Sequence, residues 1–346
     1  MTKMIRAREG DFVETFEGLI FDVKGLIHPP DRVIAYVRYI PSKKGERKRK
    51  NGKFYEKIYS LDERNKFLFE NYPEYIYFDP VFNQLLEGVP IKNIYKHYKP
   101  EGKLREMRLG FQNLTGIEKV AFEFAKLLKE KAGIPWTKIG ISGSLLVDLY
   151  NENSDIDIII YGTSNGMKVY EVLKKLVSLG TSIKSYDESG LKKLYKFRVK
   201  NTEVSFEQFA KIEERKIMQG EFKGVDYFLR FVKDWYETAE NYGEKIYIPV
   251  GRARIKAQII NNDEAIFTPC RYLIDDVSFL QGNLVYPLTE IVSFRGRFCE
   301  QARVGEHVVA QGTVEKILRP NDNVHHYRLI LGGNPEDFMI LAEEDQ

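Results

Sequence analysis

The residues best suited to chemistry are two aspartates that follow a glycine–serine pair. Gly143 and Ser144 end a short apolar segment, and ten residues separate them from Asp155, which is followed by Ile156 and Asp157. On a strand, alternation would place both carboxylates on one face, about 6.5–7 Å apart along the backbone. Such a pair suits Mg²⁺, which keeps waters and takes substrate phosphates as its other ligands. The spacing therefore indicates metal-assisted phosphoryl or nucleotidyl transfer.

These residues need a strand, a short helix and a second strand to position them. We expect the first strand at residues 137–141, the helix at 144–149 and the second strand at 155–161, where three isoleucines follow Asp157. Free N–H groups at the start of the helix can bind a phosphate, and glycine allows the phosphate to approach closely. The acids would then lie at the beginning of a buried strand, beside the glycine–serine turn.

This arrangement resembles the nucleotidyltransferase signature of the DNA polymerase beta superfamily. The signature is an apolar residue, Gly-Ser, a short helical spacer and Asp-x-Asp in an apolar strand, and the resemblance covers residues 117–211 or so. It implies that Gly143 and Ser144, with Ser154 nearby, bind the triphosphate of a nucleotide. It also implies that Asp155 and Asp157 coordinate two divalent ions, Mg²⁺ or Mn²⁺.

The resemblance further implies a third carboxylate on a later strand, which helps to activate the attacking hydroxyl. We expect that strand at residues 203–209, where alternation puts Glu203, Ser205 and Glu207 on one face. Ser205 stands where the family usually has the acid. Glu207 and Glu203 are the available catalytic acids and metal ligands, and Glu207 is preferred because it lies between Phe206 and Phe209 and not beside the turn. The arginine that often follows Gly-Ser in the family is absent, because residues 145–147 are Leu-Leu-Val.

The elements around this unit are predicted from periodicity and turn residues. Strands are expected at residues 19–23, 32–39 and 192–199, and helices at 168–179 and 225–242. A helix with apolar residues from 117 to 128 is expected to begin at a capping box from Thr115 to Glu118 and to end at Gly133. Many short strands with regular glycines fill the last third of the chain, as in a small barrel.

These expectations add up to a multidomain α+β protein. Residues 1–112 are expected to form a β-rich domain with a basic hairpin and a helical segment. Residues 113–215 would form the nucleotidyltransferase-like α/β unit with a mixed sheet. Residues 216–346 would form a linker helix and a β-rich domain that resembles an oligonucleotide-binding (OB) barrel.

Charge points to partners through its distribution, because 53 Lys and Arg against 50 Asp and Glu leave a total of only +3. Lys48, Arg49 and Lys50 lie at the tip of the basic hairpin, and Lys196 and Arg198 lie near the expected third acid. Clustered cations of this kind are typical of contact with a nucleic-acid backbone. The alternative for the hairpin is a solvated loop that protects a sheet edge from aggregation.

Composition excludes several classes of protein. A hydrophobic share of 43% and a charged share of 30% indicate a globular chain. No apolar stretch is long enough to span a membrane and the N-terminus is charged, so we expect no membrane partner and a cytoplasmic location. Cys270 and Cys299 are expected to be core residues. The chain is rich in Lys, Glu and Arg, which resembles a thermophile's composition.

The expected function is therefore a divalent-metal-dependent nucleotidyltransferase. It would move a nucleoside monophosphate from a nucleoside triphosphate, with ATP among the candidates, to a hydroxyl acceptor. The acceptor is expected to be a nucleic acid, RNA ahead of DNA. The alternative is a non-catalytic nucleic-acid-binding or assembly protein that retains the nucleotidyltransferase scaffold.

Overall fold

The computed structural model describes residues 5–180, 182–199, 202–238, 240–319 and 325–343. The chain forms two compact units, both discontinuous in sequence. The first unit is Met1–Asp79, Gln84–Ser182 and Glu221–Tyr242. The second unit is Pro80–Asn83, Ile183–Gly220 and Gly243–Gln346. Both contain helices and sheets, so the protein is α+β, although the units do not follow the three consecutive segments expected from the sequence.

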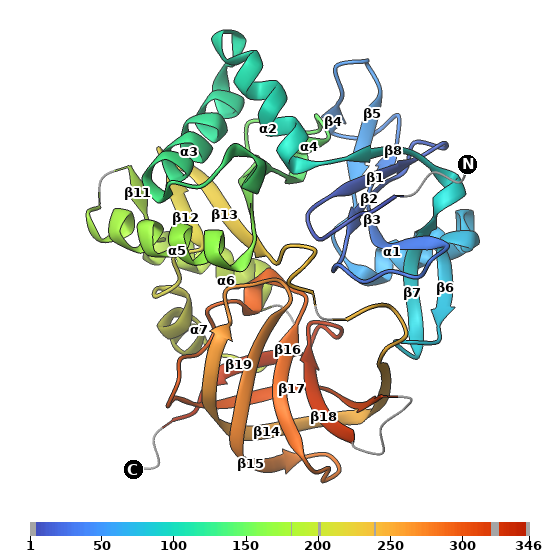
Figure 1. Ribbon diagram of the computed structural model, residues 1–346, viewed down its shortest axis with the longest axis vertical. Coiled ribbons are helices and arrows are strands. Elements are labelled where there is room, and N and C mark those ends of the chain that lie inside the picture. The colour runs from blue at the N-terminus through green and yellow to red at the C-terminus, as the bar shows by residue number, and fades with distance from the viewer. Residues whose placement is uncertain (1–4, 181, 200–201, 239, 320–324, 344–346) are drawn as a thin grey trace. The chain divides into compact units, whose positions relative to one another are not determined.

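The first unit begins with a large sheet of mostly short strands, coloured blue to cyan in Figure 1. The path of hydrogen-bonded strands is β4-β5-β3-β2-β1-β8. Outside this path, β7 pairs with β3 and also with β6. The strands expected at residues 19–23 and 32–39 are confirmed as β2 and β3. The bounds are β1 (Phe12–Thr15), β2 (Ile20–Val23), β3 (Arg32–Pro41), β4 (Arg47–Lys48), β5 (Phe54–Lys57), β6 (Ile76–Asp79), β7 (Gln84–Pro90) and β8 (Ile94–Tyr98).

A smaller sheet in the same unit carries the aspartate pair. Its strand β10 (Ile156–Tyr161) lies between β13 (Val225–Val232), to which it is parallel, and β9 (Ile139–Ile141), to which it is antiparallel. Helices α3 (Gly116–Ala132) and α5 (Thr163–Ser178) pack on one face of this sheet (Figure 1). The remaining helices of the unit are α1 (Leu61–Asn71), α2 (Pro100–Leu109) and the four-residue α4 (Gly143–Leu146).

The two faces of β10 have different neighbours. Its alternate residues Ile156, Ile158 and Ile160 are fully buried, and their partners on β13 include Tyr227 and Phe231, whose rings contact aromatic residues of α3 and α5. The N-terminal segment covers the other face. A Cβ on Gly10 would lie 2.7 Å from Cδ1 of Ile159, and the Arg8 guanidinium lies 3.3 Å from the centre of the Tyr161 ring. Asp157 lies on this second face.

The second unit contains helices and a six-stranded sheet, in which β19 pairs with β17 and the other five strands form a path. The strand path is β14-β15-β16-β18-β17, and β17 pairs again with β14, so the path returns to its start. The pair β16–β18 is parallel and the other pairs are antiparallel. The OB-like barrel remains a prediction. The bounds are α6 (Glu188–Arg198), α7 (Phe206–Glu213), β14 (Ile246–Glu264), β15 (Cys270–Gln281), β16 (Leu288–Ser293), β17 (His307–Leu318), β18 (His325–Leu331) and β19 (Phe338–Leu341).

Two short strands, β11 (Ile183–Lys184) and β12 (Gln219–Phe222), lie where the chain passes from one unit to the other. Cys270 and Cys299 are buried and free, as expected. No helix among the described residues has the length and apolar character needed to cross a membrane.

Three predicted elements were wrong. Residues 192–198 of the strand expected at 192–199 belong to α6, and residues 206–209 of the strand expected at 203–209 belong to α7. Local capping favours the helices: Asp187 accepts a hydrogen bond from the N–H of Gly190, and Ser205 and Gln208 form a capping box. Residues 225–232, expected to be helical, form β13. The Thr115 side chain makes no capping hydrogen bond, although α3 does end at Gly133 in a left-handed conformation.

Candidate functional site

The glycine–serine turn lies directly against Asp157. Gly143 has a φ of +62°, and a Cβ at this position would lie only 1.9 Å from Oδ2 of Asp157. The N–H of Ser142 donates to the carbonyl of Asp157 at 2.8 Å, which joins the turn to the start of β10. Glycine is therefore required here twice, by the left-handed backbone and by the space that the carboxylate occupies.

The two aspartates lie at the beginning of β10. Asp155 is exposed just before the strand, and Asp157 is partly buried within it. Burial, and then repulsion by Asp155, raise the pKa of Asp157 to about 7. A buried negative charge beside a second one is costly unless a cation is bound nearby.

Two serines near the pair have different surroundings. Ser144 is 5% exposed, and its Oγ has no hydrogen-bond partner among the described residues. A buried hydroxyl usually has a partner, so this one is available to a ligand. Ser154, by contrast, accepts from Arg47 at 3.2 Å and from the N–H of Asn151 at 3.0 Å. Ser154 therefore orders the loop before Asp155, and its part in nucleotide binding stays a prediction.

Charged residues from distant parts of the first unit surround Asp157. Lys24 pairs with Asp22 at 2.6 Å and with Glu9 at 3.4 Å, and Arg230 of β13 also pairs with Glu9. Asp22 and Arg230 both act electrostatically on Asp157, as does Lys57 of β5. Burial opposes ionisation of Asp22, but Lys24 and Arg230 lower its pKa, so it is a carboxylate at neutral pH. None of these residues was found from the sequence, because no local motif connects them to Asp157.

The acids expected to complete the site are in the second unit. Glu203 is 80% exposed at its side chain and pairs with Arg254 at 3.0 Å. Glu207 lies exposed in the first turn of α7. Glu207 lies on a helix and Glu203 in the segment before it, so residues 203–209 do not form the expected strand. The role of either acid as the third carboxylate stays a prediction.

Asp226 of β13 is the acid that the sheet register places beside the pair. Ile156 pairs with Tyr227 and Asp157 with Phe228 in the parallel ladder, so Asp226 precedes the ladder on β13 as Asp155 does on β10. Residues paired in register share a face, which puts Asp226 on the face of Asp155 and Asp157. The signal in the sequence is the alternation of Tyr227, Leu229 and Phe231 with Phe228 and Arg230, which fits a strand and not the expected helix.

The donor set suits a hard divalent cation. No group of three or more His, Cys, Asp or Glu side chains in the described parts of the chain lies close enough to form a complete metal cluster. Asp155 and Asp157 supply carboxylate oxygens, and Mg²⁺ commonly binds one or two carboxylates plus phosphates and waters. The Ser144 hydroxyl, which has no hydrogen-bond partner among the described residues, fits a phosphate beside them.

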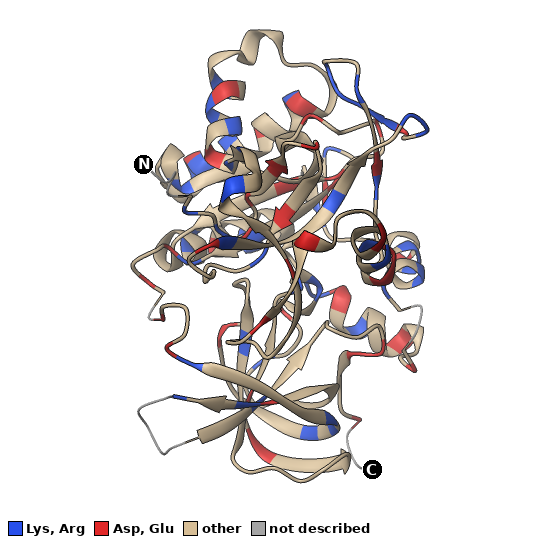
Figure 2. Ribbon diagram, turned by 90° about the vertical axis from the view of Figure 1, so that its right-hand side faces the viewer, with Lys and Arg blue, Asp and Glu red and all other residues tan. Residues whose placement is uncertain are grey.

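The residues expected to contact nucleic acid divide into exposed and engaged ones. Lys48, Lys50 and Lys196 are exposed. Figure 2 shows Lys and Arg gathered along the loop at the end of the β4–β5 hairpin. Arg49 instead donates to Glu14 at 2.9 Å and to the Tyr98 hydroxyl at 2.8 Å, so its guanidinium orders the unit and is not available for a backbone phosphate.

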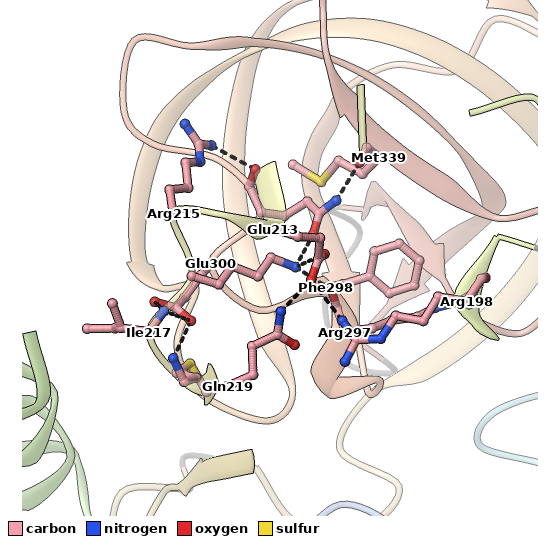
Figure 3. Close-up of polar contacts among 12 residues, drawn as sticks. Arg198, Glu213, Arg215, Ile217, Gln219, Arg297, Phe298, Glu300 and Met339 are labelled. Atoms are coloured by element: carbon pink, nitrogen blue, oxygen red, sulfur yellow. Dashed lines mark hydrogen bonds and ion pairs between the residues drawn. The ribbon is translucent and has the colours of Figure 1, made fainter. Parts of the chain in front are cut away.

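Arg198, like Arg49, forms an ion pair within the protein, in a charge network of the second unit. It donates to Glu213 at 2.8 Å, and Lys216 and Gln219 also donate to this buried carboxylate (Figure 3). Burial raises the cost of the charge on Glu213, but Lys216 and Arg198 lower its pKa overall. Arg198 therefore neutralises Glu213, and its contact with nucleic acid stays a prediction.

A hollow in the second unit is lined by other kinds of residue than the site at β10. Phe209, Phe338 and Arg297 line it together with Thr202, whose Oγ1 has no hydrogen-bond partner among the described residues. Its carboxylates are paired already, Glu213 as described and Asp337 with Arg252 at 2.8 Å. The hollow therefore lacks the two adjacent acids that distinguish the β10 site.

Comparison with known proteins connects this geometry to a family. A model of the nucleotidyltransferase domain family matches residues 123–218. The uncharacterised protein MJ1086 of Methanocaldococcus jannaschii is 31% identical over 341 residues, which cover 96% of this chain and 98% of that protein. No solved structure matches the chain.

Proposed function

We propose that this chain, which belongs to one family with the Methanocaldococcus jannaschii protein and contains a nucleotidyltransferase domain, transfers a nucleoside monophosphate from a nucleoside triphosphate to a hydroxyl acceptor. The observation that carries the proposal is the contact between Gly143 and the carboxylate of Asp157. It puts a turn with a free buried hydroxyl, on Ser144, beside two acids. Nucleotidyl transfer needs a phosphate-binding turn and acids next to each other.

Asp155 and Asp157 would hold Mg²⁺ or Mn²⁺ together with the phosphates of the nucleotide. When bound, such ions neutralise charge on the reacting phosphate and lower the pKa of an oxygen nucleophile. Gly143 and Ser144 would bind phosphate oxygens through the N–H groups of the turn and the Ser144 hydroxyl. The turn binds phosphate through these local groups and not through a helix dipole, because α4 is only four residues long.

The reaction forms one bond and breaks one. The acceptor oxygen attacks the α-phosphorus, and the bond from that phosphorus to the oxygen bridging the β-phosphate breaks, so pyrophosphate leaves with the electron pair. The hydroxyl proton passes to a carboxylate, and we propose Asp226 for this role. Its support is the register of β10 and β13, which puts it on the face of Asp155 and Asp157.

A nucleic acid is the proposed acceptor, with RNA ahead of DNA. The support is the exposed lysines of the hairpin, Lys48 and Lys50, which lie in the same unit as the aspartates. Lysines bind the phosphate backbone and do not by themselves distinguish RNA from DNA. Both acceptors therefore belong in the test.

The test is incubation of the full chain with each labelled nucleoside triphosphate, Mg²⁺ or Mn²⁺, and RNA or DNA. Labelled nucleic acid is the expected product. Asp157→Asn and Asp155→Asn should each reduce transfer about 100-fold or more, because they remove charge that stabilises the transition state. Asp62→Asn, at an exposed position in the first turn of α1, is the control.

Two outcomes would count against catalysis. Equal transfer by Asp157→Asn and the wild type would reject the assigned site. Binding of RNA and nucleotide with no transfer under any condition would favour the alternative, a binding protein that retains the scaffold.

A further inference from the structure

Two cations of the large sheet, Lys57 and Arg38, form no ion pair with a carboxylate among the described residues. The other nearby cations, Lys24 and Arg230, are neutralised by Glu9 and Asp22. Lys57 has no hydrogen bond or ion pair within the described residues, and its ammonium lies 4.9 Å from the centre of the Tyr59 ring. Arg38 donates only to the carbonyl of Ile58, at 3.4 Å, and likewise forms no ion pair in the described chain. These cations come from β5 and β3 of the large sheet.

The direction of Lys57 follows from the strand that carries it. Tyr55 and Lys57 are two residues apart on β5, so they share a face. Tyr55 is fully buried in a cluster with Leu146 and Val147, which directly follow the Gly143 turn. Tyr39, the partner of Lys57 across the ladder, belongs to the same cluster. Lys57 therefore extends from the sheet face that packs on the turn, within electrostatic reach of both Asp155 and Asp157.

A β-bulge brings Arg38 to the same place. In the β2–β3 ladder Ile20 pairs with Tyr39 and Phe21 pairs with Val37, so Arg38 is the extra residue. Bulges redirect a side chain and are common beside functional sites. Val37 faces the opposite core, with Phe21, whereas Tyr39 faces the Gly143 turn. The extra residue lets Arg38 lie close enough to Lys57 to repel it.

Asp155 and Asp157 attract Lys57, but this attraction is smaller than the combined effect of burial and of Arg38. Burial, and then the Arg38 guanidinium, lower the pKa of Lys57 to about 8. The glycine–serine turn meanwhile brings no cation of its own, because Leu145, Leu146 and Val147 follow it and are buried. A polyanion bound beside the aspartates would neutralise Lys57 and Arg38 together.

We propose that Lys57, with Arg38 beside it, binds the β- and γ-phosphates of the nucleoside triphosphate, so that the large sheet supplies part of the nucleotide site. This inference rests on the proposed function, because it needs a triphosphate at the aspartate pair. A triphosphate fits better than a nucleic-acid backbone, because Lys57 is partly buried and lies beside the acids, whereas the hairpin lysines are exposed.

The experiment measures the affinity of the full chain for ATP and for AMP with Mn²⁺, and the affinity for Mn²⁺ alone. Lys57→Met keeps most of the length of the side chain and removes its charge. It should weaken ATP binding about 10- to 100-fold, as expected for a hydrogen bond to a charged group. AMP lacks the β- and γ-phosphates, so Lys57→Met should bind it nearly as tightly as the wild type does. The variant should bind Mn²⁺ at least as tightly as the wild type. Lys57→Arg should largely retain ATP affinity.

Lys66→Met is the matched control, because Lys66 on α1 is 75% exposed at its side chain and should leave all three affinities unchanged. Equal ATP affinity of Lys57→Met and the wild type would overturn the inference while the proposed function stands. Equal weakening of ATP and AMP would also overturn it, because Lys57 would then act on a part common to both nucleotides. A wild-type chain that binds neither nucleotide would reject the proposed function and this inference with it.

Discussion

Replacing Gly143 by alanine tests the contact on which the site depends. The new Cβ would lie 1.9 Å from Oδ2 and 2.8 Å from Cγ of Asp157. Non-bonded carbon atoms prefer separations of about 3.5–4.0 Å, so the carboxyl group has to move by roughly 1.5 Å. A misplacement of about 1 Å can reduce catalysis about 100-fold. We therefore expect Gly143→Ala to lose nucleotide transfer while the fold persists.

Gly133 provides a matched control for the backbone. It has a φ of +63° at the end of α3, nearly that of Gly143, but a Cβ there would meet nothing within 4 Å. Alanine in a left-handed conformation costs about 1–2 kcal/mol at either position. The difference between the two variants therefore isolates the contact with Asp157.

The assays are urea unfolding, titration with fluorescently labelled ATP in the presence of Mg²⁺, and the transfer reaction. Both variants should lose about 1 kcal/mol or more in free energy of unfolding. Only Gly143→Ala should also lose transfer, by about 100-fold, and weaken ATP binding. If Gly143→Ala binds ATP and transfers nucleotide as Gly133→Ala does, the reasoning about this contact is wrong.

Three further predictions concern stability and the loop before Asp155. His28 accepts from the N–H of Ile34 at 3.1 Å, and burial lowers its pKa to about 4 from 6.5. Because the pKa of His28 is lower in the folded than in the unfolded state, the stability that its neutral ring contributes is complete above pH 6.5 and is lost as the pH falls toward 4. Urea unfolding should therefore show the free energy of unfolding decline by about 2–3 kcal/mol over this range, and His28→Gln should lack that decline. Glu213→Ala leaves buried cations uncompensated and should destabilise the protein by about 3–5 kcal/mol, which equal thermal unfolding of variant and wild type would contradict. Arg47→Ala removes a hydrogen bond to Ser154, which orders the loop before the aspartates, and should therefore weaken ATP binding in the titration above. Unchanged affinity would show that this hydrogen bond is not needed for ATP binding.

Local motifs were enough to predict the centre of the candidate site. Gly143, Ser144, Asp155 and Asp157 lie within fifteen residues, and the strand and turn that carry them follow from short-range patterns. The α+β class and the strands at β2 and β3 follow from similar patterns. Helix and strand were confused at residues 192–199, 206–213 and 225–232, because short amphipathic segments with aromatic residues satisfy both periodicities.

The remaining residues of the site depend on contacts between distant segments. Asp226 is placed by the register of two parallel strands, and Lys57 comes within electrostatic reach of the acids because the large sheet packs on the Gly143 turn. Arg49 and Arg198, basic in sequence, form ion pairs with buried carboxylates. The sequence by itself indicated the nucleotidyltransferase domain, since its signature lies in one short motif. The tertiary structure alone decided which charges surround the motif, because pairing between strands and burial of ion pairs join residues that are far apart along the chain.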